Sequence, residues 1–150
     1  MTTLFAFLHH LAAFMLMGAL AIEHSLIKLK IDMHVARKLQ RADMIFGISA
    51  GVILVVGFMR VVSFEKGTFY YLHSIPFILK MVLFVVIGLL SIYPTMQFIS
   101  WRQDTKNNQD PIVSDHKINL IQRIIKYELA AAILMLFCAA AAARNVGMIG

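Results

Sequence analysis

Four long apolar stretches, separated by shorter polar segments, divide the chain. Each stretch has about the 20 residues that a helix needs to cross a hydrocarbon core of about 30 Å. Backbone groups inside a bilayer must be bonded within their own segment, which favours α-helices. We therefore predict an all-α fold, an integral membrane four-helix bundle. It forms a single membrane domain over residues 1–150, with transmembrane helices near 4–27, 43–62, 75–99 and 120–143.

Two features of the predicted helices bear on their packing. Gly47 and Gly51 on the second helix are four residues apart, a spacing that lets two helix backbones approach closely. Pro94 lies inside the third helix and predicts a kink, because proline has no backbone N–H to donate. The segment 28–41 is predicted to be a short basic connector, with an interfacial helix turn as the alternative, and the segment 100–119 to be polar and rich in turns.

Composition supports a membrane protein and limits the other classes. Hydrophobic residues make up 60% of the chain and charged residues 15%, which is unusual for a soluble domain. The net charge of +6 would suggest a nucleic-acid partner in a soluble protein. Here the Lys and Arg residues concentrate in two connecting regions, so membrane topology explains the charge and we predict no nucleic-acid partner. The single cysteine, Cys138, excludes an internal disulfide and any cysteine-based metal centre.

The distribution of positive charge also predicts the orientation. Residues 28–41 and 100–126 each hold five Lys or Arg, against few in the other connector and the tail. Positive segments stay on the cytoplasmic side, so we expect a multi-pass protein of the bacterial inner (plasma) membrane with both termini periplasmic. No Lys or Arg precedes the first apolar stretch, which we therefore interpret as a retained helix rather than a cleaved signal peptide.

Histidines near both ends of the first helix give one of its faces a polar character. His10 and His24 are 14 residues apart, which leaves them only about 40° apart around a helix. Because a polar group in hydrocarbon is costly, we expect this face to look into the protein. His9 and His10 differ by about 100° around the helix, so one of the two should face inward, and the sequence does not say which.

Cations gather in the membrane half that contains the termini. His9, His10, Arg60 and Lys80 lie there, with His73 at its edge and no acid inside the layer. Such cations need anions, and a porphyrin would supply two carboxylates together with a metal that seeks imidazole. We therefore predict His10 as metal ligand with His9 as substitute, Lys80 and Arg60 as carboxylate partners, and His73 as a further cofactor-binding residue. The alternative is that one histidine of the 9–10 pair faces the lipid headgroups, that Arg60 only reaches the membrane surface, and that His73 is interfacial.

The opposite half of the membrane contains acids. Glu23 and His24 can pair with Arg41 or Arg123, and Glu128 is expected to take the same structural part. The alternative is that these groups together form a proton relay. The sequence favours the structural interpretation and leaves the relay open.

Three segments carry a resemblance to known membrane proteins over about residues 4–100: LFAFLHHLAAF, GISAGVILVVGF and IPFILKMVLFVVIGLL. The chain resembles the small bacterial four-helix membrane proteins that include the haem-containing protoporphyrinogen IX oxidase. It resembles more closely a related group of predicted membrane proteins of unknown function. The oxidase family has a histidine similar to His10 or His9 and a lysine that matches Lys80, both implicated in haem or substrate binding. This chain has Ile78 where that family tends to have another histidine.

These observations lead to a functional hypothesis with alternatives. The leading hypothesis is a haem b protein with a redox role, either porphyrinogen oxidation or electron exchange with quinone, in which Lys80 is the candidate catalytic residue. Whether the chain is an enzyme stays open; as an enzyme it would be an oxidoreductase of the protoporphyrinogen oxidase type. The alternative is a cofactor-free structural or accessory subunit, acting as a homo-oligomer or with a partner membrane subunit. A small transporter that uses Lys80, Glu23 and Glu128 is a third possibility.

Overall fold

A computed structural model of the chain describes residues 2–59, 62 and 75–144. Within this part, four helices are long and apolar enough to cross a membrane, which confirms the predicted all-α membrane bundle. A fifth, short helix follows the third of these. The helices are α1 Thr2–Leu26, α2 Met33–Met59, α4 Ile75–Ser100, α5 Arg102–Lys106 and α6 Asp115–Ala143.

The first connector is shorter than predicted, because α2 begins ten residues before the expected start of the second span. Its extra turns combine buried Ala36 and Leu39 with cations on the other faces. The first turn is capped by Asp32, whose Oδ1 accepts a hydrogen bond of 2.8 Å from the Val35 amide. Residues 33–41 are therefore helical, as the alternative of an interfacial helix turn expected, and not a non-helical connector. The charges in this segment obscured the amphipathic helix, because the predicted span was drawn from the apolar run alone.

The Asp32 cap predicts a pH-dependent stability. The hydrogen bond from the Val35 amide lowers the pKa of the Asp32 carboxyl in the folded protein. The ionised carboxylate therefore stabilises the fold at pH values above the pKa of Asp32 in the unfolded chain, and this stabilisation is lost as the pH falls through the pKa in the folded protein. We expect Asp32→Ala to lower the thermal midpoint at neutral pH and to have no effect under strongly acidic conditions. Circular dichroism melts in detergent test this expectation. Asp32→Asn is the matched control, because it keeps the acceptor and should stay close to the unmodified protein at neutral pH; equal midpoints for all three would contradict the cap.

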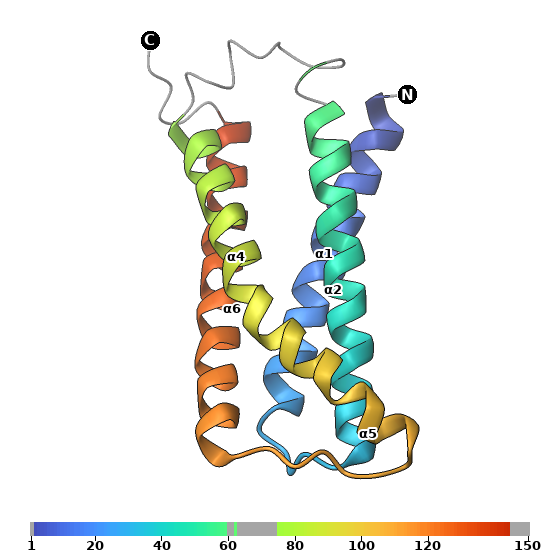
Figure 1. Cartoon of the computed structure of the whole chain (residues 1–150). Helices are drawn as coiled ribbons and strands as arrows, with labels where there is room; N and C mark the ends of the chain where they lie inside the picture. Colours follow the sequence, from blue (N-terminus) through green and yellow to red (C-terminus); the bar gives the residue numbers. More distant parts are fainter. Residues whose placement is uncertain (1, 60–61, 63–74, 145–150) are drawn as a thin grey trace.

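The spanning helices pack as two antiparallel pairs, α1 with α2 and α4 with α6 (Figure 1). The start of α1 and the end of α6 lie at the same end of the molecule. A cluster of buried apolar side chains joins the two pairs in the middle of the bundle. Its members come from all four spanning helices: Ala12, Leu16, Ala19, Leu20, Phe46, Ile53, Ile87, Ala132 and Met135.

Helix α4 connects the pairs because it changes direction within its length (Figure 1). Its first half runs beside α6, and its second half crosses toward α2 and α5. Pro94 lies inside this helix and is buried, so the predicted kink has its expected physical cause, a missing backbone donor. After the kink, Thr95 Oγ1 donates to Asp43 Oδ1 over 2.7 Å, and Gln40 Nε2 donates to the Phe98 carbonyl over 3.1 Å.

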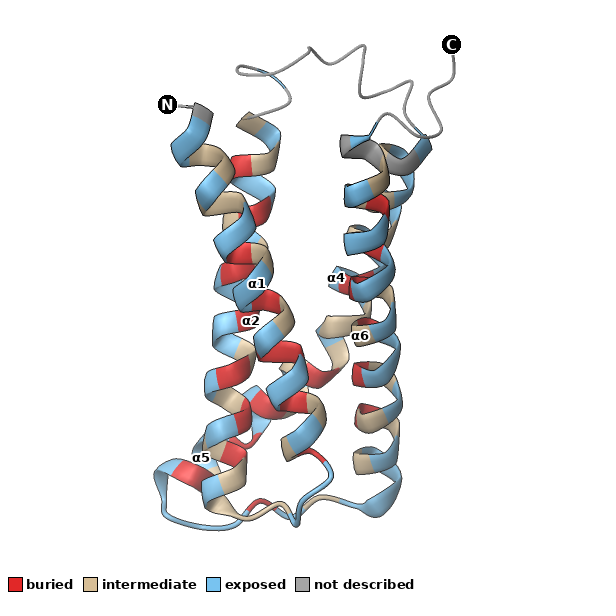
Figure 2. Cartoon of the chain, turned by 180° about the vertical axis from the view of Figure 1, so that it is seen from behind, coloured by how far each residue is buried: buried red, intermediate tan, exposed pale blue. Residues whose placement is uncertain are grey.

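A second apolar cluster closes the end of the bundle that carries α5. It is built from residues before and within α2, the end of α4, and α6: Ile27, Ala36, Leu39, Phe98, Trp101, Ile121 and Ile125. At the opposite end the two helix pairs diverge (Figures 1 and 2). The bundle is therefore tied together at one end and open between the pairs at the other.

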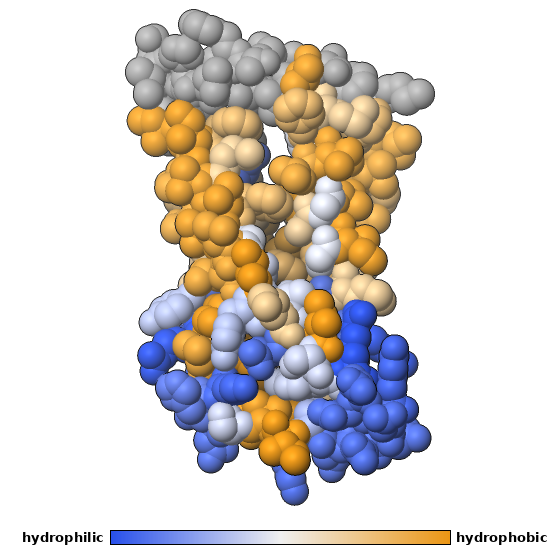
Figure 3. All heavy atoms as spheres, viewed as in Figure 1, coloured by the Kyte–Doolittle hydropathy of each residue, from blue (hydrophilic) through white to orange (hydrophobic). Residues whose placement is uncertain are grey.

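The outer surface is apolar over most of its height, as contact with a lipid bilayer requires. Figure 2 shows that the outer faces of the helices are largely exposed, and Phe14, Phe58 and Phe137 are among the exposed aromatic side chains. In Figure 3 the hydrophobic residues form a broad band, and hydrophilic residues gather at the end that carries α5.

Candidate functional site

The structure brings three of the predicted site residues to the open end of the bundle. His9 and His10 lie in the third turn of α1, and Lys80 lies in the second turn of α4. Arg60 and His73 lie outside the described residues, so their predicted roles stay predictions.

His9 is oriented toward the partner helix in its own pair. Its imidazole is partly buried, and a Cβ atom added to Gly57 of α2 would lie 3.5 Å from Cε1 of His9 and 3.7 Å from Nδ1. The ring therefore lies against the backbone of α2, where glycine leaves room for it. This contact gives His9 a packing role between α1 and α2.

His10 is held differently. Its Nδ1 lies 2.7 Å from the Ala6 carbonyl oxygen one turn earlier, and a carbonyl only accepts, so Nδ1 carries the proton in this arrangement. The lone pair is then on Nε2, and the side chain is exposed. Metal-bound histidines are commonly held in this way, with one ring nitrogen bonded to a carbonyl and the other to the metal.

The two imidazoles cannot serve one metal from opposite sides. Their centroids are 6.0 Å apart and their planes meet at 82°. Neighbouring residues on a helix diverge by about 100°, so the two rings point in different directions. A single iron would therefore take one ligand from this pair.

The helical repeat shows which way His10 faces. Around the helix, Met17 lies about 20° from His10 on one side, and Ala21 and Phe14 lie about 20° and 40° from it on the other. Met17 packs against the central apolar cluster, whereas Ala21 is exposed and Phe14 is 77% exposed. His10 therefore lies at the border between the side of α1 that faces the interior of the bundle and the side that faces outward.

Lys80 lies on the side of α4 that faces the interior of the bundle. Phe84 and Ile87 follow it on the same side of the helix. Ile87 belongs to the central cluster, and Phe84 packs against it. The Lys80 Nζ lies 5.0 Å from the centroid of the Phe77 ring, a cation–π distance. Figure 3 shows that this face of the molecule is hollowed between the two helix pairs at the open end. His10 and Lys80 therefore lie on different helix pairs, both near this open end of the bundle.

The acids form a separate layer near the closed end. Glu23 of α1 and Glu128 of α6 are only 2% and 1% exposed, and each has an Oε1 without a hydrogen-bond partner among the described residues. Glu23 lies within electrostatic range of both Glu128 and Asp43. Three of the four spanning helices thus contribute a carboxyl group to this layer, and α4 contributes Thr95 through its bond to Asp43.

The predicted ion pairs of these acids are not formed in the described part of the chain. Arg41 and Arg123 are both exposed, and His24 also has a buried Nδ1 that lacks a partner there. The prediction that Glu23 and His24 pair with Arg41 or Arg123 was wrong. Long arginine side chains at a membrane surface gain more from water than from entering the bundle.

Glu128 offers a test of this unpaired layer. Glu128→Gln keeps the shape of the side chain and removes its charge, so we expect stability equal to that of the unmodified protein or higher by about 1 kcal/mol. Glu128→Ala should instead lower stability by about 2 kcal/mol, because it leaves a cavity. Unfolding in detergent measures both variants. A clear loss in Glu128→Gln would mean that the carboxylate has a charged partner.

Sequence reasoning missed the polar links between α2 and the second half of α4. Thr95 and Gln40 were not singled out, although each bridges these two helices. The sequence shows each of them only as a neutral polar residue in or beside an apolar stretch. Which partner such a residue finds depends on the kink at Pro94, so the bonds could not be predicted.

The fold and the buried polar groups define a small integral membrane protein with four spanning helices. The chain belongs to the family described as "Predicted membrane protein (DUF2214)", whose sequence model matches residues 1–147. This membership agrees with the closer of the two resemblances, to a group of predicted membrane proteins of unknown function; the resemblance to the oxidase family stays a prediction. No curated protein and no solved structure matches the chain.

Proposed function

We propose that this membrane protein binds a b-type haem between its two helix pairs and has a redox role. The observation that carries the proposal is His10, whose Nδ1 is bonded to the Ala6 carbonyl and whose Nε2 keeps its lone pair on an exposed side chain near the open end of the bundle. Histidine held in this way fits an iron ligand, and one such residue is enough to hold a haem. His9 is the substitute ligand if α1 and α2 separate locally.

Lys80 supports the same proposal from the facing pair. Its ammonium group would hold a carboxylate, either a propionate of the porphyrin or an acidic group of a substrate, and Arg60 and His73 are proposed to assist from outside the described residues. Bound there, a haem would supply one-electron chemistry suited to porphyrinogen oxidation or exchange with a quinone. We further propose that the basic end lies in the cytoplasm and that both termini are periplasmic in a bacterial inner membrane.

Haemin and metal-free protoporphyrin together distinguish the proposed iron ligand from the proposed carboxylate partner. The purified full-length protein in detergent is titrated with haemin and with metal-free protoporphyrin, and binding is followed by absorbance. We expect His10→Ala to weaken haemin at least about tenfold and to leave protoporphyrin unchanged, whereas Lys80→Ala weakens both. Lys126→Ala, an exposed cation on α6, is the control and should change neither. A protein that binds neither compound would contradict the proposal.

A second candidate function has its own supporting observation. Gly47 and Gly51 do not pack inside the chain: both are exposed, and a Cβ atom at either position would have no described atom within 4 Å. Two open glycines four residues apart on α2 suit close docking of a helix from a second copy or another membrane subunit. We expect Gly51→Leu to reduce cross-linking between tagged copies in membranes. Gly18→Leu, at an equally open glycine on α1, is the control; unchanged cross-linking in Gly51→Leu would contradict self-association through this face.

A further inference from the structure

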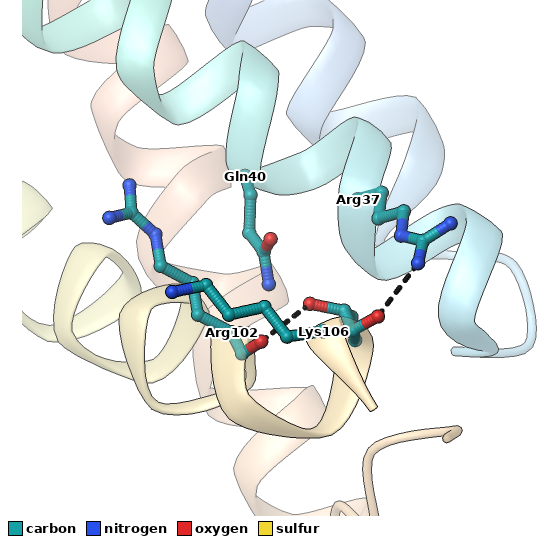
Figure 4. A pocket seen from close by; sticks show the side chains of 5 residues that line it. Arg37, Gln40, Arg102 and Lys106 are labelled. Atoms are coloured by element: carbon teal, nitrogen blue, oxygen red, sulfur yellow. Dashed lines mark hydrogen bonds between the residues drawn. The ribbon is translucent and has the colours of Figure 1, made fainter. Parts of the chain in front are cut away.

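A basic cavity lies between α2 and α5, at the closed end of the bundle and away from the proposed haem site. It has a volume of about 320 Å³ and adjoins a second cavity of about 190 Å³. Figure 4 shows Gln40 of α2 and Lys106 of α5 in the space between these helices, with the guanidinium groups of Arg37 and Arg102 on opposite sides of it. Three residues, Arg37, Gln40 and Arg102, line both cavities. The larger cavity is also lined by Thr105 and Lys106, and the smaller one by Arg41 and Met44.

The lining carries four cations and two neutral polar groups. Arg37 Nη2 donates to the Thr105 carbonyl over 2.7 Å and to Asn108 Oδ1 over 3.0 Å, so its bonds hold it in place without neutralising it. Gln40 is fixed by its bond to the Phe98 carbonyl. The cations that remain, Arg41, Arg102 and Lys106, are exposed.

Nearby acids offset this charge only in part: Asp104 lies on α5 itself but lines neither cavity. No carboxyl group lines either cavity among the described residues. Asp43 acts on Arg102 electrostatically, but its Oδ1 accepts the Thr95 hydroxyl. Asp110 is engaged elsewhere, because its Oδ1 accepts the Met33 amide over 2.8 Å. The cavity therefore has an excess of positive charge that an anion can balance.

The position of the cavity favours an anion of the membrane surface. Hydrophilic residues gather at this end of the molecule and meet the apolar band (Figure 3). Met44, an exposed apolar residue, lines the second cavity next to Arg41, so the cations lie where α2 enters the apolar band. Phosphate groups of lipids lie at this boundary, and acidic lipids attract Lys and Arg there.

We propose that this cavity binds a phosphate group, supplied by the headgroup of an anionic phospholipid of the adjoining leaflet. Guanidinium groups from two helices offer paired donors to phosphate oxygens, and Lys106 adds a point charge. The acyl chains of the lipid then lie along the exposed apolar face of α2 beyond Met44. Bound lipid would hold α5 against α2 through charge in addition to the hydrogen bonds of Arg37 and Gln40.

The test compares lipids on the purified full-length protein. Phosphatidylglycerol and phosphatidylcholine are titrated in detergent, and bound lipid is counted by native mass spectrometry. We expect saturable binding of phosphatidylglycerol in preference to phosphatidylcholine, and at least about tenfold weaker binding in the Arg41→Gln/Lys106→Gln variant. Both replaced side chains are exposed, so the variant should keep its fold, which circular dichroism checks. Lys28→Gln/Lys117→Gln removes the same charge outside the cavity and should bind as the unmodified protein does.

Competition with inorganic phosphate shows whether the bound anion is a lipid headgroup or free phosphate. If phosphate alone binds and displaces phosphatidylglycerol at similar concentration, the site takes a free phosphate and the lipid headgroup is overturned as its ligand. If the lipid binds and phosphate does not compete, the headgroup proposal is supported. Equal binding of both lipids, or equal loss in the two double variants, would overturn the proposal altogether.

Discussion

Replacing His10 with alanine is expected to weaken haem binding at least about tenfold and to remove the absorption of histidine-bound haem while leaving the helical bundle intact. The bond from Nδ1 to the Ala6 carbonyl leaves Nε2 of this imidazole for the iron, so the substitution removes the proposed metal bond. Because the side chain is exposed and outside the apolar clusters, the fold should tolerate the change. The Soret band of the purified variant measures the first effect and its circular dichroism melt the second.

Two other histidines serve as controls for this result. His34 is exposed in the first turn of α2 at the opposite end of the molecule, so His34→Ala should keep the full haem absorption. His9→Ala removes the contact with Gly57 and should lower stability more than haem content. Haem absorption that survives in His10→Ala and disappears in His9→Ala would assign the ligand to His9 and contradict the account given for His10.

Phe98→Ala is expected to cause the largest loss of stability, about 3–5 kcal/mol. The Phe98 ring is 1% exposed in the cluster that closes the bundle, and its centroid is 5.4 Å from that of Trp101. Truncation leaves a cavity where the end of α4 meets α2 and α6. Unfolding in detergent by urea or heat gives the change in the free energy of unfolding.

The neighbouring residue provides a matched control for this substitution. Ile99 is 50% exposed on the same turn of α4, so Ile99→Ala should cost less than about 1 kcal/mol. Similar losses in Phe98→Ala and Ile99→Ala would mean that the closed end is not packed as described.

The spanning helices could be predicted from the sequence because the bilayer imposes one simple requirement, a long apolar helix. The start of α2 could not, since the cations around Ala36 and Leu39 dominate the local pattern. Helix α5 was missed for a related reason: a five-residue helix in a polar segment has no apolar face long enough to detect. Its position depends on the kink at Pro94, whose existence was predictable but whose direction was not.

The candidate site was predictable in its residue types more than in its contacts. Spacing alone put His10 and Lys80 in the same half of the membrane, and the helical repeat puts Lys80 on the side of the central cluster and His10 at the border of that side. The sequence could not choose between His9 and His10, because that choice depends on where Gly57 of α2 lies. The ion pairs expected for Glu23 were wrong, since sequence proximity to arginines says nothing about whether those arginines turn outward.

Absorption spectroscopy of the purified, detergent-solubilised protein tests the proposed haem site most directly. The spectrum is recorded as oxidised and again after reduction with dithionite, with haemin added where the protein is purified without it. The account predicts a Soret band together with sharpened α and β bands on reduction, as a b-type haem gives. A protein that stays colourless in both states, also after addition of haemin, would contradict the redox proposal and favour a role in binding partner helices.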